Sequence, residues 1–171
     1  MENNTLMNYR EKYIKELKEH FGPDQRRIQH ALKVLNIAET IMDGEKVDAA
    51  LRKIVTITAL LHDVGIKAAE QKYHSSAGPY QEKEGPAIVR KIMVRQGEQE
   101  ADIQRVTYIV GGHHTWSKND GLDFQIIWEA DLMVNIQEDG LDRQREKLPG
   151  IFAKNLRTAA GKLLAKNKYP D

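Results

Sequence analysis

The stretch LLHDVG at residues 60–65 constrains this chain more than any other. An apolar run typical of a buried helix leads into it from Ala49, and Gly65 ends that run. A histidine and a carboxylate, His62 and Asp63, therefore stand together at the last turn of a helix that should be deeply buried. An uncompensated carboxylate is costly to bury, so such groups pair, hydrogen-bond or ligate a metal. The pair predicts a metal site whose other ligands lie elsewhere in the chain.

Length and composition exclude several classes of protein. The 171 residues are enough for one domain with a sizeable core, and a formal charge of +1 gives no general attraction to nucleic acid or to an anionic membrane. The chain has no cysteine, which rules out disulfides, thiolate metal sites and cysteine nucleophiles. No secretory signal and no apolar run long enough to cross a bilayer is present. We expect a cytoplasmic protein without membrane or nucleic-acid partners.

The spacing of apolar residues predicts an all-α fold, a single domain over residues 1–171 built as a bundle of about six to eight helices. The expected helices span about residues 4–20, 25–42, 48–63, 102–111 and 124–137. A further helix should begin between residues 81 and 86 and end near residue 97. The tail, residues 141–167, should also be helical, with a break at Pro149-Gly150. Asp24, Asp48 and Asp102 are the expected caps. Residues 65–79 and 115–123 should be loops, and a short hairpin between 111 and 123 stays open.

Six polar side chains occupy positions where such a bundle should be apolar. They are His30, His62, Asp63, His113, His114 and Asp131. They come from different helices or helix ends, so they could converge in the centre, where bundles build metal sites. One set is His30, His62, Asp63 and Asp131, and the paired histidines with a further carboxylate could hold a second ion bridged by Asp63. Imidazole and carboxylate suit iron, manganese, nickel, cobalt and zinc alike.

The order of these residues resembles the HD-domain superfamily of metal-dependent phosphohydrolases, over about residues 25–137. The resemblance implies an all-α core around a divalent transition metal, with His30, His62, Asp63 and Asp131 as ligands of the first ion. In members with more ions, the paired histidines and one further histidine hold them. This chain has Glu84 where that histidine is expected, and Glu84 could ligate, bridge or only hydrogen-bond a metal-bound water.

The resemblance also implies a reaction, hydrolysis of a phosphate ester by metal-activated water, with nucleotides among the candidate substrates. Asp63 would position the water. Arg27 lies three residues before His30 on the same helix face, and its planar fork suits a phosphate. Lys67 is a further candidate for neutralising phosphate charge, although the family's lysine is expected one position earlier, at Ile66.

Other interpretations of the same residues stay open. A few HD-fold proteins are similar in arrangement but use two irons and oxygen to cleave their substrates, and a non-catalytic metal- or nucleotide-binding module would need the same ligands. Taken singly, His62 and Asp63 could cap a helix, Glu84 could be a first-turn acid and Arg27 a solvated side chain. The expected partner is a small phosphorylated molecule, and a homodimer is compatible with the sequence.

Overall fold

The structure, a computed structural model, describes the backbone of residues 2–170 and the side chains from Tyr9 onward. Its α-helices are α1 (Glu2–Phe21), α2 (Gln25–Glu45), α3 (Ala49–Leu61), α4 (Ile66–Tyr73), α5 (Gly78–Arg95), α6 (Glu100–Val110), α7 (Leu122–Glu138), α8 (Leu148–Asn155) and α9 (Ala159–Lys168). Short 3-10 turns span Trp116–Lys118, Leu141–Arg143 and Arg145–Lys147. No strand occurs within residues 2–170, so the all-α prediction is confirmed and the hairpin between 111 and 123 is not formed.

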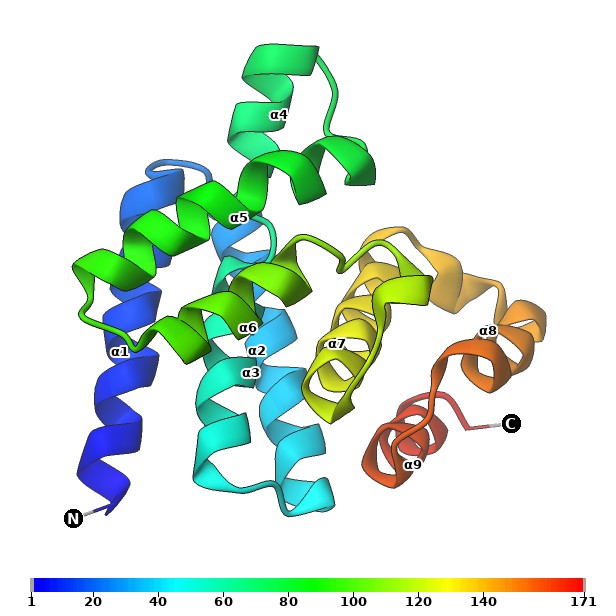
Figure 1. The fold of residues 1–171 in the computed structure, drawn as a ribbon. Helices are drawn as coiled ribbons and strands as arrows, with labels where there is room; N and C mark the ends of the chain where they lie inside the picture. The colour runs from blue at the N-terminus through cyan, green and yellow to red at the C-terminus, as the bar shows by residue number, and fades with distance from the viewer. Residues whose placement is uncertain (1, 171) are drawn as a thin grey trace.

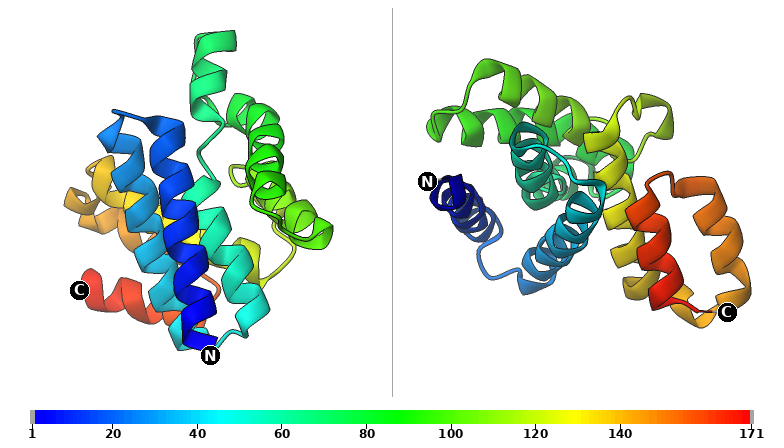
Figure 2. Two further views of the ribbon diagram at one scale, coloured as in Figure 1. Left: turned by 90° about the vertical axis from the view of Figure 1, so that its left-hand side faces the viewer. Right: turned by 90° about the horizontal axis from the view of Figure 1, so that it is seen from below.

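The helices form a bundle with a crossing pair on one face. Helices α1, α2 and α3 lie side by side, and the α5–α6 hairpin runs across them (Figures 1 and 2). Helix α7 packs against both α2 and α3, while α9 contacts α2 and α7 on the far side. The central helices α2, α3 and α7 thus surround the middle of the molecule.

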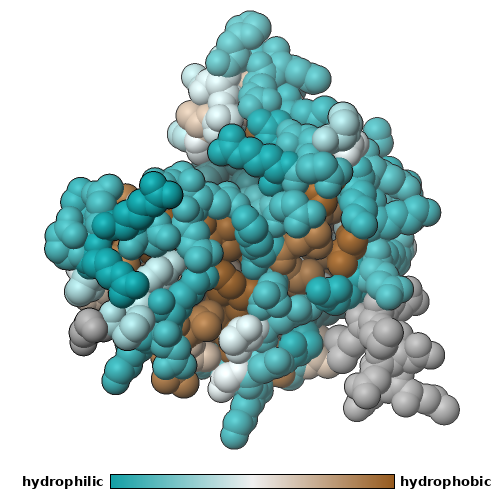
Figure 3. All heavy atoms as spheres, turned by 180° about the vertical axis from the view of Figure 1, so that it is seen from behind, coloured by the Kyte–Doolittle hydropathy of each residue, from teal (hydrophilic) through white to brown (hydrophobic). Residues whose placement is uncertain are grey.

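One continuous apolar core joins these helices. Leu17, Leu35, Leu61 and Ile127 are fully buried in it, together with side chains from α5 and α6. A smaller cluster of Met133, Leu156 and Ala165 fastens the C-terminal helices to α7. On the face turned away from the viewer in Figure 1, apolar side chains reach the surface in a band framed by hydrophilic residues (Figure 3). Within residues 2–170, no helix has the length and apolar character needed to span a bilayer.

Two of the three expected caps are formed. The carboxylates of Asp24 and Asp48 accept the backbone N–H groups of Arg27 and Leu51 at 3.2 and 2.8 Å. The prediction for Asp102 was wrong, because α6 begins two residues earlier and Asp102 stands inside its first turn. There its carboxylate accepts from Lys53 Nζ at 2.7 Å instead.

Three other expected boundaries were also wrong. Residues 66–73, expected as loop, form the helix α4. Helix α5 begins at Gly78 with Pro79 in its first turn and carries Pro86 in its interior, so the proline suited to the helix start is the earlier one. Pro149 likewise stands in the first turn of α8 and does not break a helix.

The turn after Asp63 is fixed by a close approach of two backbones. A Cβ atom on Gly65 would lie 2.5 Å from the carbonyl oxygen of Gln81 and 2.8 Å from the amide nitrogen of Gly85. Only glycine permits α5 to pack directly on this turn. The packing holds the residues that precede Gly65 in one position relative to α5.

Candidate metal centre

Four of the predicted ligands meet between α2, α3 and α7. His30 Nε2 lies 3.1 Å from Asp131 Oδ1, 3.3 Å from His62 Nε2 and 3.4 Å from Asp63 Oδ2. His62 Nε2 lies 3.4 Å from Asp63 Oδ2 and 3.7 Å from Asp131 Oδ1. Bonds of about 2.1 Å to one ion would put neighbouring ligand atoms about 3.0–3.4 Å apart. His30, His62 and Asp63 have this spacing, and Asp131 lies beside them at 3.1 Å from His30 and 3.7 Å from His62.

The hydrogen bonds of the rings leave their Nε2 atoms available for an ion. His62 Nδ1 lies 2.8 Å from the carbonyl oxygen of Ala59, and His113 Nδ1 lies 2.8 Å from that of Val110. A neutral imidazole that donates from Nδ1 carries a lone pair on Nε2, the form that binds metals. In the described part of the chain, His113 Nε2 is one of two buried side-chain polar atoms without a hydrogen-bond partner. Such an orphaned acceptor beside a carboxylate fits a metal site.

Asp63 connects this set to a second one. Its Oδ2 atom faces His30 and His62, whereas its Oδ1 atom lies 3.5 Å from His113 Nε2. The donor atoms of Asp63, His113 and His114 lie within 4.8 Å of one another, as do those of Asp63, His30 and His62. The arrangement is able to hold one divalent ion and offers three donors toward a second.

The buried groups of the centre shift one another's pKa. Burial disfavours a charged His62 imidazole, but the neighbouring carboxylates of Asp63 and Asp131 outweigh it and raise the pKa of His62 to about 9. Burial likewise opposes the ionisation of Asp63, while His62 and His113 hold its pKa at about 2. Partial burial, and then the charge of His113, lower the pKa of His114 to about 4. The carboxylates are therefore ionised at neutral pH and favour a positive charge between them.

Two residues outside the predicted set orient the ligands. Glu138 Oε2 lies 2.9 Å from His30 Nδ1, and the side-chain amide of Asn135 donates to Asp131 Oδ1 at 3.0 Å. A carboxylate on the far nitrogen of a metal-binding histidine fixes the ring and makes it a stronger ligand. Both residues follow Asp131 on α7, at intervals of four and seven, which is the helical spacing that could have identified them from the sequence.

Glu84 does not join either group. Its carboxylate accepts from Lys72 Nζ at 2.5 Å and from Tyr73 O–H at 2.8 Å, and these hydrogen bonds lower its pKa. Gln81, three residues earlier, takes the place beside the paired histidines, with Oε1 3.2 Å from His114 Nε2. Gln81 has no ionisable group and stood at the edge of the helix expected from the sequence, so no sequence signal pointed to it.

The two predicted phosphate-binding side chains already have protein partners. The Arg27 guanidinium pairs with Glu70 at 2.5 Å and with Asp24 at 3.1 Å. Lys67 is exposed in the first turn of α4, and its ammonium donates to the carbonyl oxygen of His20 at 3.2 Å. Their roles in binding phosphate stay predictions.

The chain and its fold are similar to known proteins. The family model described as HD domain matches residues 27–154, which is about three quarters of the chain. A crystal structure of a predicted HD superfamily hydrolase from an uncultured Thermotogales bacterium has a similar fold, with a TM-score of 0.64 and 19% identity. The alignment covers 93% of this chain and 84% of that one. No curated protein matches significantly.

Proposed function

Because the chain belongs to the HD-domain family, we propose that it is a metal-dependent phosphohydrolase that acts on a small phosphate ester, with nucleotides among the candidate substrates. One observation carries the proposal. The Nε2 atoms of His30 and His62 lie 3.3 Å apart, and both lie within 3.7 Å of carboxylate oxygens of Asp63 and Asp131. A divalent metal held by nitrogen and oxygen ligands can activate a water molecule for hydrolysis.

In this proposal each residue has a distinct role. His30, His62, Asp63 and Asp131 would hold a divalent transition metal, with His113, His114 and Gln81 as the donors nearest to a second ion. When bound, the metal would lower the pKa of a coordinated water and polarise the phosphoryl group. Asp63, which faces both sets, would orient that water and accept its hydrogen bond.

The charge of the phosphate would be met by side chains beside the centre. Arg27 lies one helical turn before His30, and its ion pairs with Asp24 and Glu70 hold the guanidinium in a fixed position. A preorganised guanidinium can receive a phosphate without paying for its own ordering. Lys67 in α4 would add a second cation, provided that its ammonium leaves the His20 carbonyl.

The first experiment measures metal content and turnover together. The protein is stripped with chelator and reloaded separately with manganese, iron, cobalt, nickel or zinc, and the bound metal is quantified by mass spectrometry. Phosphate release is then measured over a panel of nucleotides and simple phosphate esters. We expect at least one metal to support release from a subset of the panel. Folded, metal-loaded protein that releases phosphate from no substrate in the panel would contradict the proposal.

A matched pair of variants connects the activity to the centre. Asp63→Ala should abolish turnover while circular dichroism stays unchanged, because the side chain contributes ligands and contacts at the centre alone. Asp139→Ala removes an exposed carboxylate just beyond α7 and should keep full activity. An active, metal-replete Asp63→Ala protein would reject the assignment of Asp63.

A second candidate is an oxidative di-iron enzyme, which the position of Asp63 between two donor groups favours. Protein purified without oxygen would then contain two irons and give a mixed-valent paramagnetic signal after partial oxidation. One ion per chain, together with phosphate release supported by manganese or cobalt, would exclude this candidate.

A further inference from the structure

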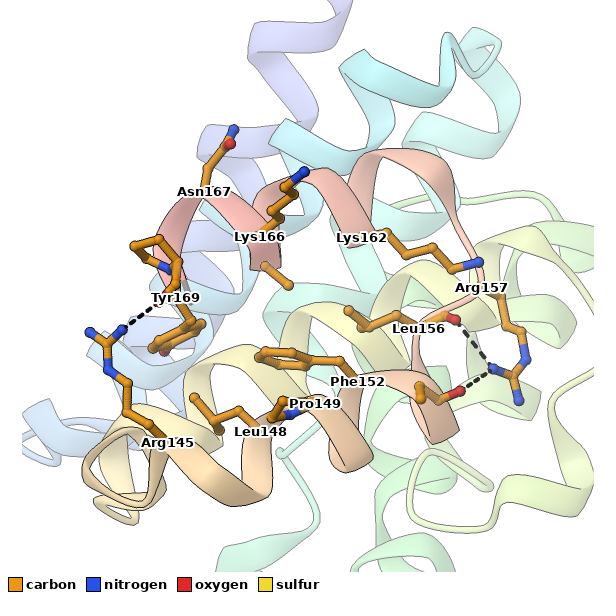
Figure 4. A pocket seen from close by; sticks show the side chains of 13 residues that line it. Arg145, Leu148, Pro149, Phe152, Leu156, Arg157, Lys162, Lys166, Asn167 and Tyr169 are labelled. Atoms are coloured by element: carbon orange, nitrogen blue, oxygen red, sulfur yellow. Dashed lines mark hydrogen bonds between the residues drawn. The ribbon is translucent and has the colours of Figure 1, made fainter.

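A trough between α8 and α9 is separate from the metal centre. Its volume is about 840 Å³, within the range of about 300–1,000 Å³ typical of small-molecule sites. Figure 4 shows the two helices as its walls, with the turn before α8 and the residues after α9 closing one end. Nothing in the proposed hydrolytic mechanism uses this region.

The floor of the trough is apolar. Phe152, Leu156 and Leu148 project into it from α8 and the residue after it, and the Tyr169 ring lies 5.8 Å from the Phe152 ring. Leu148 and Leu156 are buried against the core, whereas Phe152 is half-buried and faces the trough. The part of Phe152 that stays exposed is apolar surface that a ligand could bury.

The charged residues that line the rim are basic. They are Arg145, Arg157, Lys162 and Lys166, and no carboxylate is among the lining residues in the described part of the chain. The Arg157 guanidinium donates to the backbone carbonyl oxygens of Ala153, Lys154 and Leu156, and within the described residues it forms no ion pair with a carboxylate. An apolar floor below unneutralised guanidinium and ammonium groups is complementary to a molecule with an apolar body and an anionic head.

The two ends of the trough differ. Arg157 and Lys162 stand together at one end, while Arg145 and Tyr169 are at the other (Figure 4). Burial, and after it the negative charge of Asp142, raise the pKa of Tyr169, so the second end already has a carboxylate near it. The anionic head therefore belongs beside Arg157 and Lys162, with the apolar chain running over Phe152 toward Tyr169.

We propose that this trough is a binding site for a free fatty acid, whose carboxylate pairs with Arg157 and Lys162 and whose chain covers Phe152. The pairing is one of charge and shape and involves no covalent step. It is independent of the metal centre and of the proposed hydrolysis.

The test uses dodecanoate and the full chain. The guanidinium carbon of Arg157 lies 5.4 Å from the centre of the Trp116 ring, which packs edge-on against Trp128. These are the two tryptophans of the sequence, so their fluorescence should change when a carboxylate reaches Arg157. We expect saturable, one-to-one binding by calorimetry and by fluorescence, below the concentration at which dodecanoate forms micelles.

Two kinds of variant separate charge from shape. Arg157→Gln with Lys162→Gln should weaken binding about tenfold, because two exposed ion pairs are lost. Lys91→Gln with Lys154→Gln removes the same charge from outside the trough and should leave binding unchanged. Ala153→Trp fills the trough while keeping its charges and should abolish binding. Because this variant tests the site without altering Arg157 or Lys162, the proposal can be judged even if the charge variant fails to fold.

Several results would overturn the proposal. If neutral dodecanol bound as tightly as dodecanoate, the carboxylate would not contribute to binding. An unchanged affinity in the charge variant would show the same for Arg157 and Lys162. Association with anionic phospholipid vesicles without binding of monomeric dodecanoate would show a membrane-facing surface. Dimerisation by light scattering that Ala153→Trp disrupts and dodecanoate does not would assign the trough to a second copy of the chain.

Discussion

Two of the acids on helix α7, Glu129 and Asp131, have completely different surroundings. Glu129 is fully buried and receives only donors: the Gln125 side-chain amide, the backbone N–H groups of Arg157 and Thr158, and the Thr158 hydroxyl, at 2.5 to 2.9 Å. Asp131 faces the imidazoles of His30 and His62 and a second carboxylate across the centre. The hydrogen-bond donors around Glu129 come from the protein itself. Asp131 lies beside a second carboxylate, an arrangement that suits a bound cation.

The contrast shows how a structural carboxylate differs from a ligand. The donors of Glu129 fasten the start of α9 to α7, and a Cβ atom on Gly161 would lie 2.0 Å from its Oε2 atom. Only a glycine fits at that contact, so the acid and the helix start are matched to each other. At the metal centre the neighbours of Asp131 include groups that repel or compete with it, an arrangement that a protein keeps for binding an ion.

The largest effect expected is the loss of metal from Asp131→Ala. Removing one ligand should lower metal affinity at least about 100-fold and turnover on the order of 1,000-fold, while the metal-free protein still folds and loses only the contacts of Asp131 with His30, His62 and Asn135. Metal titration and chemical denaturation measure the two quantities. A destabilised Asp131→Ala protein that still binds metal would place Asp131 in the same class as Glu129.

Glu129→Ala should give the reverse pattern. Its buried donors lose their acceptor, so the unfolding free energy should fall by about 3 kcal/mol, and the melting temperature by roughly 9 °C for a chain of this size. The folded fraction should still bind metal at the original stoichiometry. Glu129→Gln, which keeps one acceptor oxygen, serves as the control and should be less destabilised. Loss of metal in folded Glu129→Ala protein would break the distinction between the two acids.

The metal-free and metal-loaded proteins should respond oppositely to pH. In chelator-treated protein the pKa of His62 is about 9, above its ordinary value of 6.5, so its stabilising contribution is complete below pH 6.5 and is lost as the pH rises through 9. Metal binding needs the neutral ring, so metal affinity should increase over the same interval. Denaturation series with chelator and with metal, between pH 6.5 and 9, would show the two slopes. Parallel slopes would mean that His62 is not a ligand.

The smallest effects concern Gln81 and Glu84. Gln81→His would replace an amide oxygen beside His114 by an imidazole and should raise affinity for a second ion about tenfold, read as metal content per chain. Glu84→Gln should change metal content and turnover by less than about twofold, because its partners are Lys72 and Tyr73. A loss of the second ion in Glu84→Gln would restore the residue to the centre.

The sequence was most informative where polar side chains occupy positions that should be buried. His62 and Asp63 end an apolar helix, a position that is costly for polar groups, and that cost is what pointed to a shared centre. The all-α fold followed from apolar spacing in long helices such as α2 and α7. The structure brings the six predicted side chains together, and their roles as ligands remain predictions.

Other features had no comparable signal. Helix α4 has eight residues and buries only Ile66 and Ala69, which is too short for a recognisable period. The start of α5 at Gly78 places Gln81 beside His114, whereas Glu84 was predicted because it stands where the family's further histidine is expected. The partners of Glu129 include backbone N–H groups 28 and 29 residues later, which no side-chain pattern identifies.

The ligands of the centre have a consequence for how the chain unfolds. His30 and Asp131 are separated by 101 positions, so an ion held by both would close a loop over most of the protein. A covalent cross-link across a loop of about 100 residues restricts the unfolded chain by about 4–5 kcal/mol. In a chain without cysteine, the bound cation would take the place of a disulfide cross-link. Resistance to proteases would then increase with the fraction of the protein that holds metal.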